Sequence, residues 1–344
     1  GGLAMRKESY EEGKKIGYIQ TSAMLTELKR QEEFAFFEAA DSIALQQSLR
    51  DLDRSFVNFF QKRASYPTFK SKHNRFQSYR TVNQKDNIRI VGRYIKLPKL
   101  GFVKIRQSME VEKINHVIIE HTPLENIFAV LNVDFEPEPR SNAGGTIGID
   151  VGIKAFYSDS NGNTVSNPRY LERSMRKLIR EQRRLSRKQK DSHNREKQRI
   201  RVARVYEKVT NQRNDFLQKQ STMLVRENQT ICIEDLNVKG MIRNHKLAKS
   251  IASVSWAKFF KMLEYKASWY GNEIQRVPTM YPSSQTCSSC GYRNPRIKNL
   301  SIRIWECRNA MQFMTGIRMQ ALNSEKSTAD AVCIKMKSCT VGHT

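Results

Sequence analysis

The sequence predicts an α+β protein of several domains: a helical N-terminal module, a small β-barrel-like domain and an α/β core with long basic helices. Three observations support this prediction. Apolar residues recur at helical spacing up to about residue 66, and short alternating stretches follow Pro67. An α/β pattern begins after a Pro- and Gly-rich segment near residue 140. The chain of 344 residues is also longer than one hydrophobic core usually fills.

The charge balance indicates the kind of partner. The chain has 60 Lys and Arg against 34 Asp and Glu, which gives a net charge of +26 and a pI near 10.0. Such a field attracts polyanions, so we expect nucleic acid rather than an anionic membrane or an acidic protein. No run of ~18 apolar residues and no signal-peptide pattern is present. The alternative is a basic surface with no binding role.

The N-terminal elements follow from periodicity. Residues 1–66 form the predicted helical module, in which Ala44, Leu45, Leu49 and Leu52 share one helical face. Residues 67–140 form the predicted small β domain, because the stretches 87–98, 101–107, 116–121 and 128–135 alternate in the manner of strands. Residues 136–145 are rich in Pro, Gly and polar side chains, so we expect a linker there and a domain boundary near residue 140.

The core is predicted to span residues 141–280. A β-hairpin opens it around the turn pair Asn161-Gly162, and two long helices fill residues 169–227 with a break near residues 191–194. Residues 230–236 predict a buried central strand, and residues 256–270 predict an amphipathic helix closed by Gly271. The second long helix carries an apolar stripe that faces a core or its partner helix, formed by Val202, Val205, Val209, Phe216, Leu217, Met223 and Leu224.

Two acidic residues stand in otherwise apolar strands. Asp150 lies within GIDVG and Glu234 ends TICIE, with Asp235 beside it. A buried acid is costly unless it is paired or binds metal, and hard carboxylate oxygens suit a divalent cation. The alternative for Asp150 is an Asp that caps a turn at the end of a strand.

The six cysteines include one C-x-x-C pair, which in the absence of a secretory pattern predicts reduced thiols. Cys287 and Cys290, with Cys307 beyond them, have the spacing of a zinc ribbon, predicted here for residues 281–310. A complete ribbon needs a second Cys three residues after Cys307, and Ala310 stands there. We therefore expect an incomplete zinc site. The substitutes to consider are Cys333, Cys339 and His343.

Basic residues supply candidate contacts to nucleic acid. We expect phosphate contacts from Arg183, Arg184, Arg187, Lys188, Lys239 and Lys246. A charged run of this kind can equally be a solvated helix face. Two sets of interleaved aromatic and basic residues could stack on bases: Phe69, Lys70, Lys72, His73, Phe76 and Tyr79, and then Tyr265, Lys266, Trp269 and Tyr270. For Trp256, Phe259, Phe260 and Trp269 itself, core packing is the preferred interpretation.

Five segments together resemble the TnpB-type proteins of bacterial insertion sequences. They are GIDVGIKAF (148–156), NPRYLERSMRKLIREQRRLSRKQK (167–190), NREKQRIRVARVYEKVTNQRNDFLQK (194–219), IEDLNVKGMIRNHKLAKSI (233–251) and YPSSQTCSSCGY (281–292). The resemblance extends over nearly the whole chain up to Cys307. It implies an RNA-guided DNA endonuclease with a RuvC-like, RNase H-type nuclease core, a transposon-derived guide RNA, double-stranded target DNA and a cytoplasmic, nucleoid-associated location in a bacterium.

The resemblance also implies roles for single residues. Asp150 and Glu234 match the first catalytic Asp and the catalytic Glu, which would ligate Mg²⁺. Cys287, Cys290 and Cys307 match three of the four ligands of the family's zinc ribbon. The N-terminal module and the β domain match the parts that contact guide RNA and the target-adjacent duplex. The chain resembles the family only from partway into the first helical segment, so we expect the β domain to lack its opening strand.

A second departure concerns catalysis. Where the family continues with a fourth Cys and an H-D-R-D-x-N-A segment bearing its third catalytic Asp, this chain reads RNAMQFMTGIRMQALNSEKS. Reverse translation of residues 311–320 from the third base of the Met311 codon gives Ala, Ile or Val, His or Tyr, then Asp, and can continue as Arg, Asp, Lys, Asn and Ala. We therefore predict a frameshift between Cys307 and Asn309 and an out-of-frame tail at residues 311–344. Asp330 in this tail is expected to be a coincidence.

Three functions remain open at this point. An intact relative would be a Mg²⁺-dependent, RNA-guided DNA endonuclease, but two carboxylates alone would hold the metals poorly, so cleavage is expected to be weak or absent. The second candidate is a catalytically dead, RNA-guided DNA-binding protein, because phosphate contacts need no catalytic carboxylate. The third is a non-functional remnant. The sequence leaves the oligomeric state undetermined.

Overall fold

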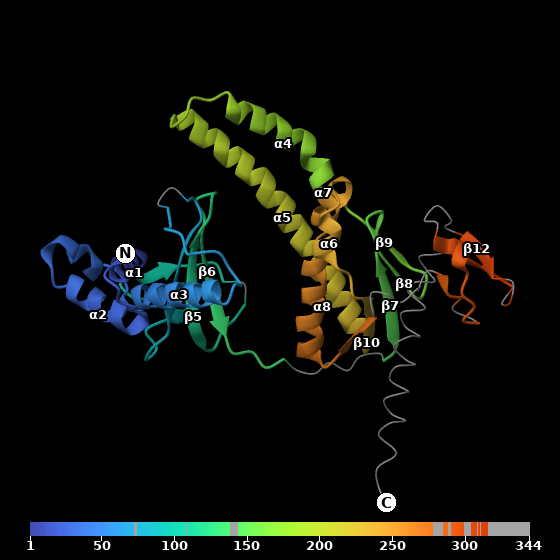
Figure 1. Cartoon of the computed structure of the whole chain (residues 1–344), viewed down its shortest axis with the longest axis horizontal. Coiled ribbons are helices and arrows are strands. Elements are labelled where there is room, and N and C mark those ends of the chain that lie inside the picture. Colours follow the sequence, from blue (N-terminus) through green and yellow to red (C-terminus); the bar gives the residue numbers. More distant parts are fainter. Residues whose placement is uncertain are drawn as a thin grey trace, which may run out of the picture. The chain divides into compact units, whose positions relative to one another are not determined.

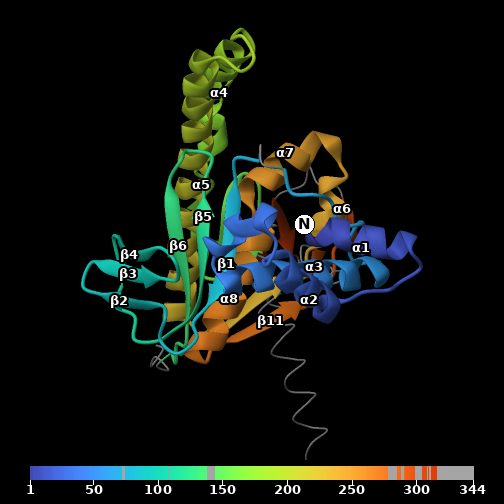
Figure 2. The same cartoon turned by 90° about the vertical axis from the view of Figure 1, so that its left-hand side faces the viewer.

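A computed structural model describes residues 1–71, 74–107, 109–137, 144–277, 285–287, 290–298, 304–307, 309 and 311–315. The chain divides into two compact units, Gly1–Phe135 and Glu136–Thr344 (Figures 1 and 2). The N-terminal unit contains the helical module together with the β strands. The C-terminal unit contains the α/β core.

Four helical segments open the N-terminal unit: α1 (Gly2–Glu11), α2 (Tyr18–Leu28), the 3₁₀ segment η1 (Glu32–Glu38) and α3 (Ser42–Phe60). The predicted helical module is therefore helical. Asp41 caps α3 by accepting a hydrogen bond from the backbone N–H of Ile43 at 3.0 Å, which satisfies one of the free donors of the first turn. Arg80 on the first strand donates to Asp51 of α3 at 2.7 Å, so α3 packs against the β part of the unit.

The β strands of this unit form two separate sheets. Strands β1 (Gln77–Val82), β5 (Ile114–His121) and β6 (Ile127–Val133) pair antiparallel in the order β1-β5-β6. Strands β2 (Arg89–Val91), β3 (Tyr94–Leu97) and β4 (Gly101–Lys104) form the second antiparallel sheet. Both sheets contribute to one apolar core, formed by Ile88, Ile95, Leu97, Ile114 and Val117.

This arrangement corrects the prediction of a barrel-like domain. The four predicted strand stretches are confirmed, but the described strands make two open three-stranded sheets rather than one closed sheet. Strand β1 was not predicted. Its residues, QSYRTV, are mostly polar and exposed, and only Thr81 is buried, so the sequence carries no apolar alternation.

The C-terminal unit is built on a five-stranded mixed sheet in the order β11-β10-β7-β8-β9. Strands β7 (Thr146–Val151), β10 (Thr230–Glu234) and β11 (Glu273–Val277) are parallel neighbours. Strands β8 (Ala155–Asp159) and β9 (Thr164–Ser166) continue from β7 as antiparallel hairpins. The predicted hairpin turn is confirmed, because Gly162 joins β8 to β9 with a φ of +89°. Strand β10 is buried and lies between β11 and β7, which confirms the predicted buried strand, but the central strand of the sheet is β7.

Helices cover the sheet and supply most of the core. These are α4 (Tyr170–Ser186), α5 (His193–Glu227), α6 (Val238–Ile242), α7 (His245–Val254) and α8 (Trp256–Tyr270). Ile231 and Ile233 of β10 are fully buried against Leu217 of α5 and Leu263 of α8. The predicted helix 256–270 is thus confirmed, and it ends at Gly271 in the left-handed conformation, with a φ of +75°. Helices α6 and α7 and strand β11 were not predicted.

Helices α4 and α5 form a hairpin that extends away from the sheet (Figure 1). Its own small core consists of Leu178, Val202 and Val205. Within it, buried Gln198 donates to the buried carboxylate of Glu181 at 2.7 Å and to the Glu181 backbone carbonyl at 3.1 Å. The predicted break between the helices is confirmed, because α4 ends at Ser186 and α5 begins at His193.

The predicted apolar stripe of α5 is correct except at Met223, whose side chain is 38% exposed. Val202 and Val209 are buried, and so are Leu217 and Leu224 further along the helix. A straight α-helix has 3.6 residues per turn, so positions seven residues apart drift by about 20° per heptad. The buried face of α5 therefore shifts from the positions of Val202 and Val209 to those of Leu217 and Leu224. In the described part of the chain, no helix is long and apolar enough to cross a membrane.

Candidate nuclease site and cysteine cluster

Asp150 and Glu234 lie on adjacent parallel strands. Asp150 is on β7, where Ser158 of β8 is its partner on one side, and Glu234 ends β10. Ile149 is paired with Ile233 across β7 and β10, so the next residue of each strand is the acid. Because the carboxyl ends of parallel strands meet at one edge of the sheet, the structure brings the two predicted catalytic acids together there. Both side chains are partly buried.

The two acids are electrostatically coupled. Desolvation raises the pKa of the Asp150 carboxyl from 3.8 to about 8, and the negative charge of Glu234 contributes further to this rise. Repulsion between carboxylates in a poorly solvated place is the situation that a bound cation relieves. Oxygen ligands of this kind fit Mg²⁺, which carboxylates hold together with water and substrate oxygens.

Asp235 does not complete this site. Its carboxylate receives a hydrogen bond from Arg276 at 3.0 Å, and the same guanidinium pairs with Glu264. Among the described residues, the cysteine cluster is the one group of three or more potential ligands whose ligand atoms lie within 4.8 Å of one another. The described structure therefore adds no third Asp, Glu, His or Cys to Asp150 and Glu234. Asp330 lies outside the described residues.

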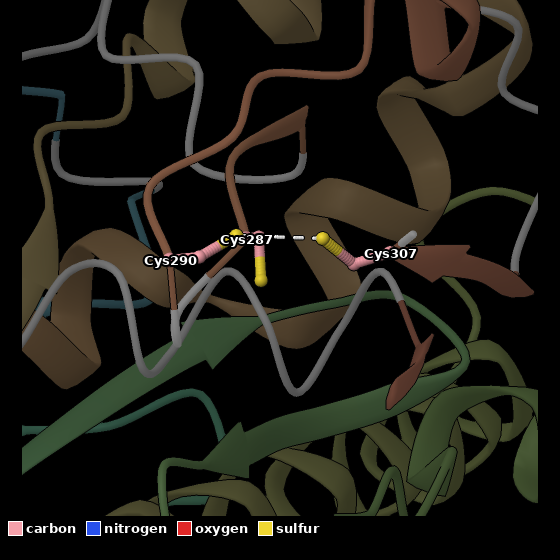
Figure 3. A group of neighbouring side chains, drawn as sticks. All are labelled: Cys287, Cys290 and Cys307. Atoms are coloured by element: carbon pink, nitrogen blue, oxygen red, sulfur yellow. Dashed lines mark hydrogen bonds between the residues drawn. The ribbon is translucent and has the colours of Figure 1, made fainter. Parts of the chain in front are cut away.

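Cys287, Cys290 and Cys307 converge on one point (Figure 3). The first two lie on a tight turn, in which the N–H of Gly291 donates to the Cys287 carbonyl at 2.9 Å and Gly291 has a φ of +73°. Cys307 ends β12 (Ile304–Cys307), which pairs with β13 (Gln312–Thr315). Cys287 and Cys307 are buried, whereas Cys290 is exposed.

The spacing of the three sulfurs fits a zinc ion. The Sγ atoms of Cys290 and Cys307 are 3.4 Å apart, and all three Sγ atoms lie within 4.8 Å of one another. Zn–S bonds of about 2.3 Å in a tetrahedron place sulfurs roughly 3.8 Å apart. The three thiols therefore occupy three corners of such a site. Ala310, Cys333, Cys339 and His343 lie outside the described residues.

Four of the six predicted phosphate contacts lie in the last turn of α4 and in the segment that joins α4 to α5. Arg183, Arg187 and Lys188 are exposed, and Arg184 is exposed with an ion pair to Glu181 at 3.3 Å. Lys239 and Lys246 belong to α6 and α7, but their side chains lie outside the described part. In the first aromatic set, Phe69, Phe76 and Tyr79 are exposed, as stacking requires. Lys72 and His73 lie outside the described residues.

The second set of aromatic and basic residues, Tyr265, Lys266, Trp269 and Tyr270, is only partly available for contacts with nucleic acid. Lys266 is buried, with 6% of its surface exposed, and donates to the Gln218 carbonyl, the Ser221 hydroxyl and the Thr222 hydroxyl. Desolvation lowers its pKa to about 8. Lys266 thus ties α8 to α5 and is not a contact for a nucleic-acid backbone. Core packing is confirmed for Trp256, Phe259 and Phe260 but is wrong for Trp269, which is 43% exposed.

Sequence reasoning did not single out a cleft at the same sheet edge as the two acids. Its lining includes Asn167, Arg169 and Arg213. Arg213 is one of many cations in a basic helix, so the sequence pattern does not distinguish it from its neighbours. Only the structure shows that residues of three distant segments, 167–171, 213–217 and 253–254, lie together.

Two family profiles and a solved structure match this chain. The OrfB_IS605 family profile, described as a probable transposase, matches residues 108–245, and a Cas12f1-like TNB domain profile matches residues 256–314. A solved Cas12f1-sgRNA-target DNA complex has the same type of fold, with a TM-score of 0.55, 15% identity, and coverage of 94% of this chain and 78% of that chain.

Two curated relatives are closer in sequence. A "Putative RNA-guided DNA endonuclease" of Streptomyces pristinaespiralis is 38% identical over 87% of this chain and 74% of the relative. The "Putative RNA-guided DNA endonuclease InsQ" of Escherichia coli K12 is 31% identical over 84% of this chain and 76% of the relative. With such identity over most of both sequences, and with paired strand acids on a mixed α/β fold, the chain belongs to the TnpB-type proteins of insertion sequences.

Proposed function

We propose that this protein is an RNA-guided DNA-binding protein whose RuvC-like nuclease core cleaves DNA weakly or not at all. The observation that carries the proposal is the pair Asp150 and Glu234, to which the described structure adds no third ligand. Both relatives bear the name "Putative RNA-guided DNA endonuclease", which supports a guide RNA and double-stranded DNA as partners. Its place of action would be the bacterial nucleoid.

Asp150 and Glu234 would hold Mg²⁺ at the carboxyl edge of the sheet. The bound ion would supply a nucleophilic water and neutralise charge on the phosphodiester. Both carboxylates must be deprotonated to ligate a cation, and the raised pKa of Asp150 means that protons compete for this position up to about pH 8. A complete two-metal site needs more ligands than two carboxylates, so the expected defect lies in cleavage and not in binding.

The binding surfaces do not depend on these acids. The basic hairpin of α4 and α5 carries exposed Arg183, Arg187 and Lys188, which can contact phosphates electrostatically. For the N-terminal unit we propose contacts to guide RNA and to the target-adjacent duplex. The three cysteines would hold Zn²⁺ with an incomplete ligand set, so zinc is expected at well below one ion per chain.

The test is expression of this chain together with its flanking transposon-end DNA. RNA that co-purifies is sequenced, and a plasmid matching it is assayed for binding and for cleavage in Mg²⁺ buffer. We expect binding with little or no cleavage. Robust cleavage that disappears in Asp150→Ala would refute the loss of catalysis. Failure to bind both RNA and DNA would leave a non-functional remnant, the third candidate.

The origin of the tail is tested separately on the DNA of the locus. The frameshift hypothesis predicts that the alternate frame downstream of the Cys307 codon encodes a Cys followed by an H-D-R-D-type segment. An alternate frame without this segment would rule the hypothesis out. It would leave the missing third ligand unexplained.

A further inference from the structure

We propose that Ser158 is a positioning residue of the nuclease site, whose hydroxyl is oriented by Thr164 and hydrogen-bonds to a water molecule on the cation held by Asp150. This inference rests on the proposed function, because it adds an outer layer of polar groups to the site named there. The sequence did not single out either hydroxyl.

The register of the sheet places the two hydroxyls beside Asp150. Asp150 of β7 is paired with Ser158 of β8, and Ser158 is paired with Thr164 of β9. Residues directly opposite one another in antiparallel strands have their side chains on the same face of the sheet, with Cβ atoms about 4.5 to 5.5 Å apart. Glu234 lies on this face too, because it follows the isoleucine that pairs with the residue before Asp150. One face therefore carries acids on β7 and β10 and hydroxyls on β8 and β9.

The opposite face of the same strands belongs to the apolar core. Ile149 and Tyr157, which directly precede Asp150 and Ser158, are almost fully buried among core side chains. Successive side chains of a strand alternate between the two faces, so Asp150 and Ser158 lie on the side away from that core. Ser158 is nevertheless only 4% exposed. A hydroxyl in such a place is expected to have hydrogen-bond partners.

Ser158 keeps acceptor capacity beyond its bond to Thr164. The two hydroxyl oxygens are 3.1 Å apart and share one hydrogen bond, which is the one side-chain hydrogen bond that Ser158 makes among the described residues. A serine hydroxyl has one O–H group and two lone pairs. Thr164 is exposed and can donate its own O–H to solvent, so donation from Ser158 to Thr164 satisfies both groups. This arrangement leaves the lone pairs of Ser158 for a donor beside Asp150.

Water on a cation at Asp150 and Glu234 is such a donor. Two carboxylates cannot fill the octahedral shell of Mg²⁺, so several of its ligands are water molecules. Groups that hydrogen-bond to the ligands of a metal fix their orientation and contribute to its affinity. Ser158 has no direct hydrogen bond to Asp150 among the described residues, and a bridging water is the contact that suits opposite side chains at this spacing.

Ser160 is the matched control on the same segment. It directly follows β8 and is 5% exposed, and its Oγ accepts a hydrogen bond from the backbone N–H of Gly148 at 3.2 Å. This hydroxyl therefore serves the backbone of β7, at a position where a glycine and not an acid stands opposite. Its loss should affect folding and leave the cation site unchanged.

The test is the Kd for Mg²⁺ of the full chain and its variants, obtained at pH 8.5 from the dependence of urea stability on Mg²⁺ concentration. Stability in EDTA is measured first for each variant, which separates a folding defect from a change in Kd. Ser158→Ala should raise the Kd about tenfold. Ser160→Ala should lower the stability in EDTA with no change in Kd.

Thr164 supplies a second test that does not alter a buried side chain. Thr164→Val removes the hydroxyl that orients Ser158 and should raise the Kd by a smaller factor than Ser158→Ala does. Thr164→Ser keeps a hydroxyl and should leave the Kd unchanged. These two variants decide the question even where Ser158→Ala fails to fold, because Thr164 is exposed.

The Asp150→Asn variant separates the inference from the site on which it rests. An unchanged Kd in Ser158→Ala and Thr164→Val, with Mg²⁺ binding lost in Asp150→Asn, would overturn the inference and leave the two-acid site intact. An equal rise in Ser158→Ala and Ser160→Ala would also overturn it, since the cause would then be a general loosening of the strand. Absence of Mg²⁺ binding by the unmodified chain would overturn both the inference and the proposed metal site.

Discussion

Replacement of Asp150 by asparagine should stabilise the protein by an amount that grows as the pH rises from about 4 to about 8. The folded state raises the pKa of Asp150 from 3.8 to about 8, so between these values the folded chain binds more protons than the unfolded chain. Stability contributed by this site therefore falls as pH rises from about 4 towards 8. An asparagine side chain is similar in size to that of aspartate and cannot ionise, so the variant escapes this loss.

The size of the effect follows from the pKa. A displacement from 3.8 to about 8 corresponds to a ceiling of about 6 kcal/mol in the free energy of unfolding. Asp150 is only partly buried, so water and local relaxation reduce the penalty for its charge. We expect Asp150→Asn to gain about 2 to 3 kcal/mol at pH 8.5 and almost nothing at pH 4.

Urea denaturation followed by tryptophan fluorescence measures the free energy of unfolding of the C-terminal unit. All three tryptophans, Trp256, Trp269 and Trp305, lie after Phe135, so the signal reports on the C-terminal unit. EDTA is present to exclude cations. Asp215→Asn is the control, because Asp215 is an exposed acid on α5 paired with Lys219 at 2.8 Å. A stability gain for Asp150→Asn that is equal at both pH values, or a loss at pH 8.5, would refute the reasoning.

Three further outcomes are expected. Mg²⁺ at ten times its Kd should stabilise the unmodified chain by about 1.4 kcal/mol at pH 8.5 and leave Asp150→Asn unaffected in the same urea assay; equal stabilisation of both would contradict the site. Gly271→Ala should cost about 1 kcal/mol in the free energy of unfolding, because Gly271 has a φ of +75° and an added Cβ meets nothing within 4 Å, so backbone strain is the only effect; an unchanged urea midpoint would argue against it. Cys307→Ser should abolish the residual zinc content measured by atomic emission, whereas Cys232→Ala in β10 should not; retained zinc in Cys307→Ser would exclude the three-thiol site.

The local patterns of the sequence determined most elements of the core. A long basic stretch with little Gly or Pro, interrupted near residue 191, predicted α4 and α5. Gly271 predicted the end of α8, and the helix does end there with Gly271 in the left-handed conformation. Asp150 was identified as a site residue because a carboxylate in an apolar strand needs a partner. Such features are local, so they can be read without knowledge of the packing.

Only the tertiary structure decided which side chains are available. Lys266 resembles a surface cation in sequence, but its side chain is buried against α5. The carboxylate of Asp235 forms an ion pair with Arg276. Strand β1 pairs with β5 without an apolar pattern of its own. Arg213 is distinguished from the other basic residues only where Asn167 and Ser253 converge on it from distant segments. Burial and the pairing of charges depend on contacts between residues far apart in the chain, which no local period encodes.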